Sequence, residues 1–100
     1  MQTLVIYDIE NDNIRNKMAE ICKDYGLERI QYSAFLGELN HNKREELFLK
    51  LRKNLQRKKG NIQLFPICEK DLHLRKIYII EEEGNKKCLT DKINSPKNKQ

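Results

Sequence analysis

The N-terminal part of the chain contains a short apolar run, Leu4–Ile9, that carries a carboxylate near its end. Its β-branched and aromatic residues favour an extended backbone, and the lack of polar alternation predicts a strand covered on both faces. Alternation along a strand places Leu4, Ile6 and Asp8 on one side and the other three residues on the opposite side. Asp8 is therefore expected beside two buried residues, where it needs a metal, a cation or a hydrogen-bond donor.

The segment after this strand follows a helical period. Asn11 or Asp12 is the expected N-cap, because a short side-chain oxygen can accept a hydrogen bond from an orphan amide. The helix is expected to run to about Tyr25, where Gly26 suits a left-handed C-terminal stop. Its apolar face consists of Ile14, Met18, Ile21, Cys22 and Tyr25.

A second helix is expected over about residues 43–58. Asn42 followed by Glu45 has the form of a capping box, and Gly60 is the expected end signal. The apolar stripe of this helix consists of Leu47, Phe48, Leu51 and Leu55. The remaining positions are strongly basic: Lys43, Arg44, Lys50, Arg52, Lys53, Arg57, Lys58 and Lys59. Such a charge run is usually a solvated helix face, and a track for a nucleic-acid backbone is the functional alternative.

Three further segments have strand-like patterns. Residues 27–39 alternate apolar and polar positions until the phase changes near Ser33, which leaves open one kinked strand or two short strands. Residues 61–68 predict another strand, and Pro66 restricts it to a sheet edge or a strand end because proline lacks an N–H donor. Residues 74–80 predict a last strand.

This order of elements predicts an α+β ferredoxin-like βαββαβ sandwich with an antiparallel sheet and an additional C-terminal strand. The domain is expected to span residues 1–84, followed by a polar, mobile tail over 85–100. Right-handed crossovers place both helices on one face of the sheet. Because the first strand is apolar on both sides, a second copy is expected to cover the other face in a homodimer, and the last strand could pair with its neighbour's edge.

Composition narrows the class of protein. The formal charge of +5 suits a polyanionic partner, although many basic proteins bind none. Cys22, Cys68 and Cys88 form no C-x-x-C pair, which argues against a disulfide framework and a thiolate zinc site. The start lacks a basic signal-peptide region, and no apolar run approaches the roughly 20 residues of a membrane span. We therefore expect a soluble, cytoplasmic protein without membrane association.

Three features of the sequence recur together in one known family. A strand carries Asp8, a helix opens with Arg15, and the run Arg29-x-Gln31-x-Ser33-x-Phe35-x-Gly37 follows. Over most of its length the chain resembles the small CRISPR-associated Cas-two family. The resemblance implies a ferredoxin-like homodimer that acts with an integrase partner in acquiring new CRISPR spacers.

The resemblance also implies a metal-dependent endonuclease that acts on RNA or double-stranded DNA. It makes Asp8 the metal-binding aspartate and places Arg15, Arg29 and Phe35 at positions implicated in catalysis or substrate contact. Lys17 stands where some members have an arginine, which keeps the charge but loses the bidentate fork. Mg²⁺ takes hard oxygen ligands and often uses one or two carboxylates plus substrate phosphate, so one Asp8 per chain, doubled by a dimer axis, could bind it.

Each of these residues also has a purely structural interpretation. Asp8 could accept hydrogen bonds from the amides that open the following helix. Arg15 and Arg29 could be surface cations, and Phe35 could be an ordinary core residue. Three functions stay open: the metal-dependent endonuclease, a non-catalytic dimeric DNA-binding scaffold of the spacer-integration complex, and an unrelated ferredoxin-like RNA-binding module. The absence of stacking aromatics on a sheet face argues against the last.

Overall fold

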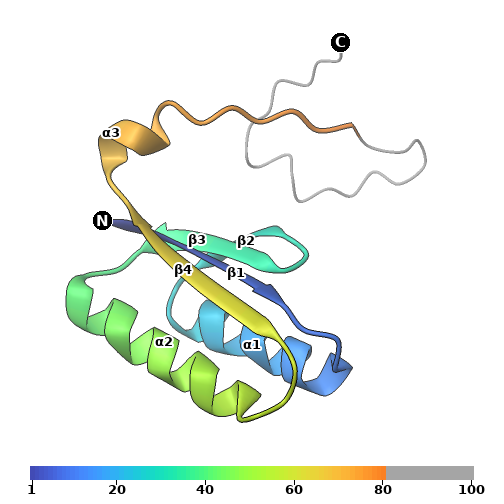
Figure 1. The fold of residues 1–100 in the computed structure, drawn as a ribbon. Coiled ribbons are helices and arrows are strands. Elements are labelled where there is room, and N and C mark those ends of the chain that lie inside the picture. Colours follow the sequence, from blue (N-terminus) through green and yellow to red (C-terminus); the bar gives the residue numbers. More distant parts are fainter. Residues whose placement is uncertain (81–100) are drawn as a thin grey trace.

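A computed structural model describes residues 1–80 and has the predicted α+β ferredoxin-like order. Its elements in chain order are β1 (Gln2–Asp8), α1 (Asp12–Asp24), β2 (Glu28–Gln31), β3 (Ala34–Glu38), α2 (His41–Leu55), β4 (Asn61–Ile67) and the short α3 (Glu69–Leu72). The sheet is antiparallel, with the strand order β2-β3-β1-β4. Both long helices cover the same face, as the handedness of the crossovers predicts (Figure 1).

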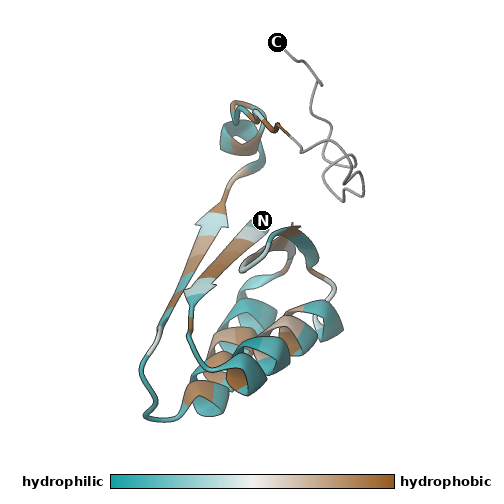
Figure 2. Cartoon of the chain, turned by 90° about the vertical axis from the view of Figure 1, so that its right-hand side faces the viewer, coloured by the Kyte–Doolittle hydropathy of each residue, from teal (hydrophilic) through white to brown (hydrophobic). Residues whose placement is uncertain are grey.

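The central strand β1 separates a packed side of the sheet from an open side. Val5 and Tyr7 are buried beneath the helices, and Val5 lies opposite Phe35 of β3. On the other side, Leu4 is only partly buried and Ile6 is 38% exposed. Apolar stretches run along the strands while the long helices pack on one side only (Figure 2). The helices therefore cover one face of β1, and the face that stays open in a single chain is the one that a second copy is predicted to cover.

The limits of α1 agree with the local signals. The side chain of Asn11 accepts a hydrogen bond from the Ile14 amide at 2.9 Å, which selects Asn11 over Asp12 as the N-cap. Gly26 has a φ of +86°, the left-handed conformation that glycine adopts without strain. The Leu27 amide then donates to the Cys22 carbonyl at 3.1 Å and turns the chain toward β2.

The limits of α2 differ from the prediction. The N-cap is Asn40, whose side chain accepts from the Lys43 amide at 2.8 Å, so the helix starts before the predicted Asn42–Glu45 capping box. The helix ends at Leu55, and Gln56, with a φ of 57°, takes the left-handed position predicted for Gly60. The start was predicted wrongly because Asn40 and Asn42 both satisfy the N-cap rule. The end was predicted wrongly because Gln56 takes a positive φ, a conformation that local rules assign to glycine.

The alternating segment 27–39 resolves into the two short strands β2 and β3, joined by a tight turn at Tyr32 and Ser33. The pairing shifts register between Arg29 and Gln31, which indicates a bulge or similar irregularity there. Bulges bend a strand and redirect its side chains, and this one lies beside Tyr32.

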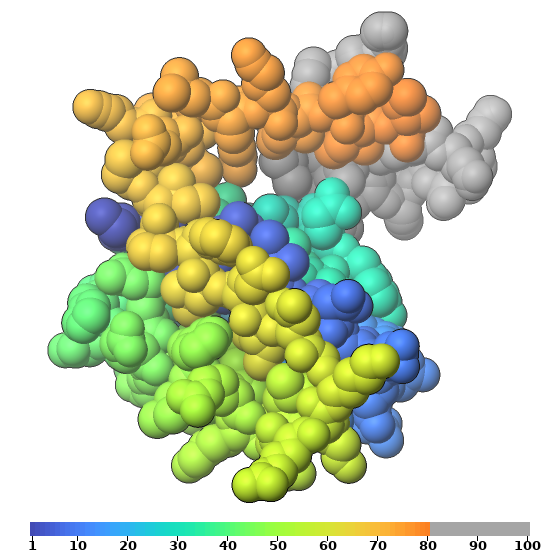
Figure 3. Space-filling view, viewed as in Figure 1, coloured from blue at the N-terminus to red at the C-terminus, as the bar shows by residue number. Residues whose placement is uncertain are grey.

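The predicted strand over residues 74–80 does not form within the described chain. After α3, which the sequence pattern did not predict, the chain crosses the open side of the sheet without pairing with any of its strands (Figures 1 and 3). β2 and β4 are edge strands without a further partner in residues 1–80, but the segment after α3 pairs with neither of them and its strand propensity alone does not make it a strand. The predicted boundary at residue 84 and the tail 85–100 lie outside the described residues.

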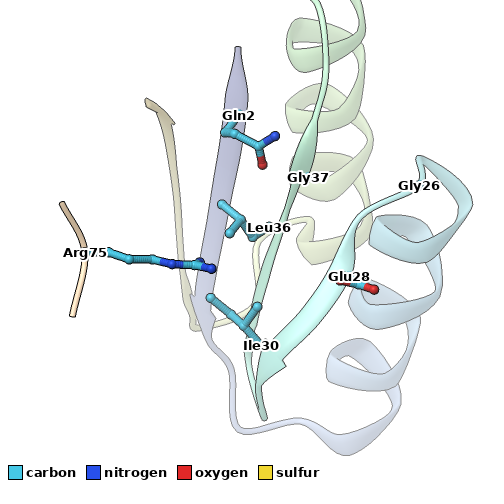
Figure 4. Close-up of a pocket in the computed structure, with 7 residues that line it drawn as sticks. All are labelled: Gln2, Gly26, Glu28, Ile30, Leu36, Gly37 and Arg75. Carbon is cyan, nitrogen blue, oxygen red and sulfur yellow. The ribbon is translucent and has the colours of Figure 1, made fainter. Parts of the chain in front are cut away.

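A cavity of about 300 Å³ lies at the open face of the sheet and includes one residue of this crossing segment. Ile30 and Leu36 line it from the sheet, and Arg75 extends toward them from the crossing segment (Figure 4). Within residues 1–80 no helix is long and apolar enough to cross a membrane.

Candidate functional site

Asp8 is the last residue of β1 and lies exposed at the open side of the sheet. A pocket of about 200 Å³ adjoins it, lined also by Glu10, Lys59, Gly60 and Asn61. Asn61 comes to this position because it lies opposite Asp8 in the antiparallel pairing of β1 with β4. The sequence indicated Asp8, and Glu10 follows it closely in the chain, while Lys59 and Asn61 reach the pocket through a strand register that local patterns do not reveal.

The oxygens around this pocket fit a hard cation in part. The carboxylates of Asp8 and Glu10 and the side-chain amide of Asn61 are ligand types that Mg²⁺ accepts, and Mg²⁺ commonly keeps several waters. No group of three or more His, Cys, Asp or Glu side chains that could hold a metal occurs in the described part of the chain. A metal bound here therefore needs water, substrate phosphate or a second subunit to complete its coordination.

Arg15 is tied to the loop between β1 and α1. Its Nη1 donates to the carbonyls of Ile9 at 2.9 Å and Glu10 at 3.2 Å, and its Nη2 pairs with Asp12. The hydrogen bond with Asp12, followed by one with Tyr32, raises the pKa of Arg15 and keeps it charged. These bonds hold Arg15 to the loop and to Asp12 instead of to the Asp8 carboxylate.

Arg29 lies against buried aromatic rings on the helix-covered side of the sheet. Its guanidinium carbon is 5.2 Å from the ring centroid of Phe35, which is completely buried. Phe35 in turn stacks on Tyr7, with centroids 6.4 Å apart and an interplanar angle of 19°. Phe35 therefore supports Arg29 from below, and its burial prevents it from touching a substrate directly.

Two polar atoms of this aromatic layer lack partners. The Tyr7 hydroxyl and the Arg29 Nε are buried without a hydrogen-bond partner among residues 1–80. Burial raises the pKa of Tyr7, and the nearby Arg29 guanidinium offsets part of that rise. Unpaired buried polar groups are uncommon in proteins and often accompany functional sites.

The predicted site residues thus form two groups. Arg15, Arg29 and Phe35 gather around the β2–β3 turn, while Asp8 lies on the opposite side of the sheet. The two groups are connected through the backbone, because the Tyr7 amide donates to the carbonyl of the turn residue Ser33 at 3.0 Å. Lys17 lies apart from both groups, exposed on α1, and pairs with Glu20 at 3.6 Å.

The comparisons with known proteins agree with this architecture. The family model for CRISPR associated protein Cas2 matches residues 1–74. The chain belongs to the Cas2 family. This result confirms the resemblance indicated by Asp8 and the Arg29–Gly37 run, and it excludes the hypothesis of an unrelated RNA-binding module.

Individual Cas2 relatives extend the match. The chain is 53% identical over 76 residues to the CRISPR-associated endoribonuclease Cas2 of Desulforudis audaxviator, covering 76% of this chain and 72% of that protein. It is 36% identical over 67 residues to a CRISPR-associated endonuclease Cas1/endonuclease Cas2 fusion of Thermoproteus tenax, covering 67% of this chain and 25% of the fusion. The crystal structure of Streptococcus pyogenes Cas2 at pH 6.5 matches with a TM-score of 0.68 and 20% identity, over 78% of this chain and 99% of that chain, which shows a shared fold.

Proposed function

We propose that this member of the Cas2 family is a Mg²⁺-dependent endonuclease that hydrolyses phosphodiester bonds of nucleic acid and works as a homodimer in the cytoplasm. The observation that carries the proposal is Asp8, exposed at the end of β1 beside a pocket that Glu10, Lys59 and Asn61 also line. The name of the relative from Desulforudis audaxviator, an endoribonuclease, supports RNA as one substrate.

The residues of the pocket would have different roles in the reaction. Asp8, Glu10 and Asn61 supply oxygens that would hold the metal, which when bound polarises a phosphoryl oxygen and activates water. Lys59 contributes a cation to the same pocket and would bind a non-bridging oxygen of the scissile phosphate. Arg29 and Arg15 would bind further phosphates of the same strand.

The open face of the sheet supports the proposed homodimer. Leu4 and Phe65 lie opposite each other in register on this face, and Phe65 and Ile6 are 43% and 38% exposed. A second copy packed on this face would remove these side chains from water and bring two Asp8 carboxylates toward one cleft. The paired carboxylates would supply the metal ligands that one chain lacks.

The substitution Asp8→Ala tests the proposed chemistry. We expect cleavage of single-stranded RNA or double-stranded DNA to require Mg²⁺, to stop with a chelator and to fall at least about 100-fold in the variant. Asp24→Ala removes an exposed carboxylate at the other end of α1 and is the matched control, with cleavage unchanged. Cleavage that is equal in both variants contradicts a role for Asp8.

A second candidate function is a dimeric DNA-binding scaffold that acts with an integrase partner in spacer acquisition, with or without cleavage. The fusion of Cas1 with Cas2 in Thermoproteus tenax and the exposed lysines and arginines of α2 favour it. Spacer acquisition by Asp8→Ala separates the two functions. Acquisition that continues without cleavage supports the scaffold, and acquisition that is lost together with cleavage supports the endonuclease.

A further inference from the structure

Tyr32 is an exposed aromatic residue at the tip of the β2–β3 turn. It is 67% exposed, although residues of this size and apolar character are usually at least half covered. The Arg15 guanidinium carbon lies 5.4 Å from its ring centroid and that of Arg29 lies 5.9 Å away. Tyr32 thus joins two partly buried arginines from different elements into one cluster with an exposed ring.

The side chains of both arginines in this cluster are held in place by other residues. Arg15 is fixed by the loop carbonyls and Asp12, and Arg29 rests on the buried ring of Phe35. Within residues 1–80 Arg29 makes no salt bridge with a carboxylate, and its Nε is buried without a partner. A partly buried guanidinium without a counter-ion favours an anion such as a phosphate as its partner.

We propose that Tyr32 is a base-stacking residue for single-stranded nucleic acid, with Arg29 binding the adjoining phosphate. The ring keeps most of its surface free despite both arginine contacts, so a flat base can stack on it. The bases of a continuous duplex are already stacked on each other, and only an unpaired base can meet Tyr32 in this way. The proposal adds a substrate class, single-stranded nucleic acid, to the proposed function. Binding at Tyr32 does not depend on that function, and only the cleavage of the bound strand rests on it.

The position of Tyr32 connects this platform to the proposed reaction centre. The next residue, Ser33, accepts a hydrogen bond from the Tyr7 amide, and Asp8 follows Tyr7 in β1. A strand whose base rests on Tyr32 therefore lies near the end of β1, and it has to pass around that end to reach Asp8 on the open side of the sheet. Tyr32 acts here as a positioning residue for the substrate and takes no part in the chemistry.

Binding of a short oligothymidylate, measured by fluorescence anisotropy, tests the platform without cleavage. We expect Tyr32→Ala to weaken binding by about 5- to 100-fold, because stacking on an aromatic side chain is lost. Tyr32→Phe is the matched control that keeps the ring, and we expect its affinity to stay within about twofold of the wild-type value. The same strand made of abasic nucleotides is expected to bind both variants equally, and the duplex form is expected to show no effect of Tyr32→Ala.

The salt dependence of binding distinguishes the role of Arg29 from that of Tyr32. Removal of one phosphate contact lowers the slope of log affinity against log salt by about 0.7 for a single strand, which we expect for Arg29→Ala. Tyr32→Ala is expected to leave this slope unchanged. A lower slope in Tyr32→Ala, or an equal loss of affinity for abasic and normal strands, shows that Tyr32 only orients the arginines and overturns the proposal.

A direct reporter gives an independent measurement. The chain contains no tryptophan, so Tyr32→Trp introduces a single fluorescent indole at the platform. A base that stacks on it is expected to quench its emission, with single-stranded RNA and DNA as separate arms, whereas the abasic strand is not. Quenching without any cleavage leaves the platform standing and refutes the endonuclease, while cleavage without quenching refutes the platform.

Discussion

The two faces of the sheet carry similar residues in different surroundings. On the helix-covered face, Phe35 is fully buried and supports Arg29. On the open face, Phe65 is 43% exposed, and Asp8 forms no salt bridge within residues 1–80. The arginine side is therefore organised before any ligand arrives. The carboxylate side depends on what binds to it, whether metal, substrate or a second copy.

The largest expected effect comes from Phe35→Ala on the packed face. Removal of a fully buried phenyl ring leaves a cavity and is expected to lower the free energy of unfolding by about 3–5 kcal/mol. Urea denaturation followed by circular dichroism measures this change. A loss below about 1 kcal/mol would mean that the packed face is not the main source of stability.

A smaller effect is expected from Gly37→Ala, two residues after Phe35 in β3. A Cβ atom here would lie 2.7 Å from Leu27 Cδ2 and 3.0 Å from Leu27 Cα, so the backbone itself has to move. We expect a loss of about 1–3 kcal/mol in the free energy of unfolding. Gln31→Ala, at an exposed position of β2, is the control and is expected to stay within about 0.5 kcal/mol.

Phe65→Ala makes the same substitution on the open face. Because Phe65 is 43% exposed and lies outside the buried core, we expect the monomer to stay folded and the dimer to dissociate about tenfold more readily, which corresponds to about 1.4 kcal/mol. Sedimentation velocity over a range of protein concentrations reports the change. Dimerisation equal to that of the wild type would show that this face is not the subunit interface.

The smallest effect concerns a titratable contact within the helix layer. The Tyr25 hydroxyl donates to Glu46 at 2.6 Å, which raises the pKa of Tyr25 from 10.0 to about 12 and lowers the pKa of Glu46. A raised tyrosine pKa means that the stabilisation is complete below pH 10 and is lost between pH 10 and 12. The Glu46 contribution is lost as the pH falls below about 4.5.

Urea denaturation across these two pH ranges measures the contact. Tyr25→Phe removes the hydroxyl and keeps the ring between Lys43 and Lys50, so it is the matched control. We expect the wild type to lose its advantage over this variant at both pH extremes. An advantage that stays constant from pH 4 to 12 would contradict the assigned hydrogen bond.

The pattern of apolar and polar residues predicted those parts of the fold that depend on residues close together in the sequence. Alternation in β1 assigned Val5 and Tyr7 to one side and Leu4 and Asp8 to the other, and the structure has this arrangement. The N-cap of α2 was predicted wrongly because Asn40 and Asn42, two residues apart, both suit that position. The prediction of a strand over residues 74–80 was wrong because a strand has to pair with the edge of another strand. The propensities of its residues do not show whether the chain runs along such an edge.

The candidate site likewise contains residues that the sequence identified and residues that only the structure reveals. The family motif identified Asp8 and Arg29, but Lys59 and Asn61 reach the Asp8 pocket through the register of β1 with β4. Tyr32 could not be found from spacing, because its contacts with arginines of two elements depend on how the β2–β3 turn is directed. The sequence offered its position inside the Arg29–Gly37 run as a signal, and the irregular strand pairing beside it is visible only in the structure.

Pro66 in β4 affects how this protein avoids aggregation. β4 is an outer strand of the sheet, and such strands can recruit further strands without limit. Pro66 leaves a gap in the row of donors along this edge, so a foreign strand cannot form an uninterrupted ladder there. The missing donor therefore disfavours continuous strand addition along this edge, which is the kind of pairing that leads to fibres.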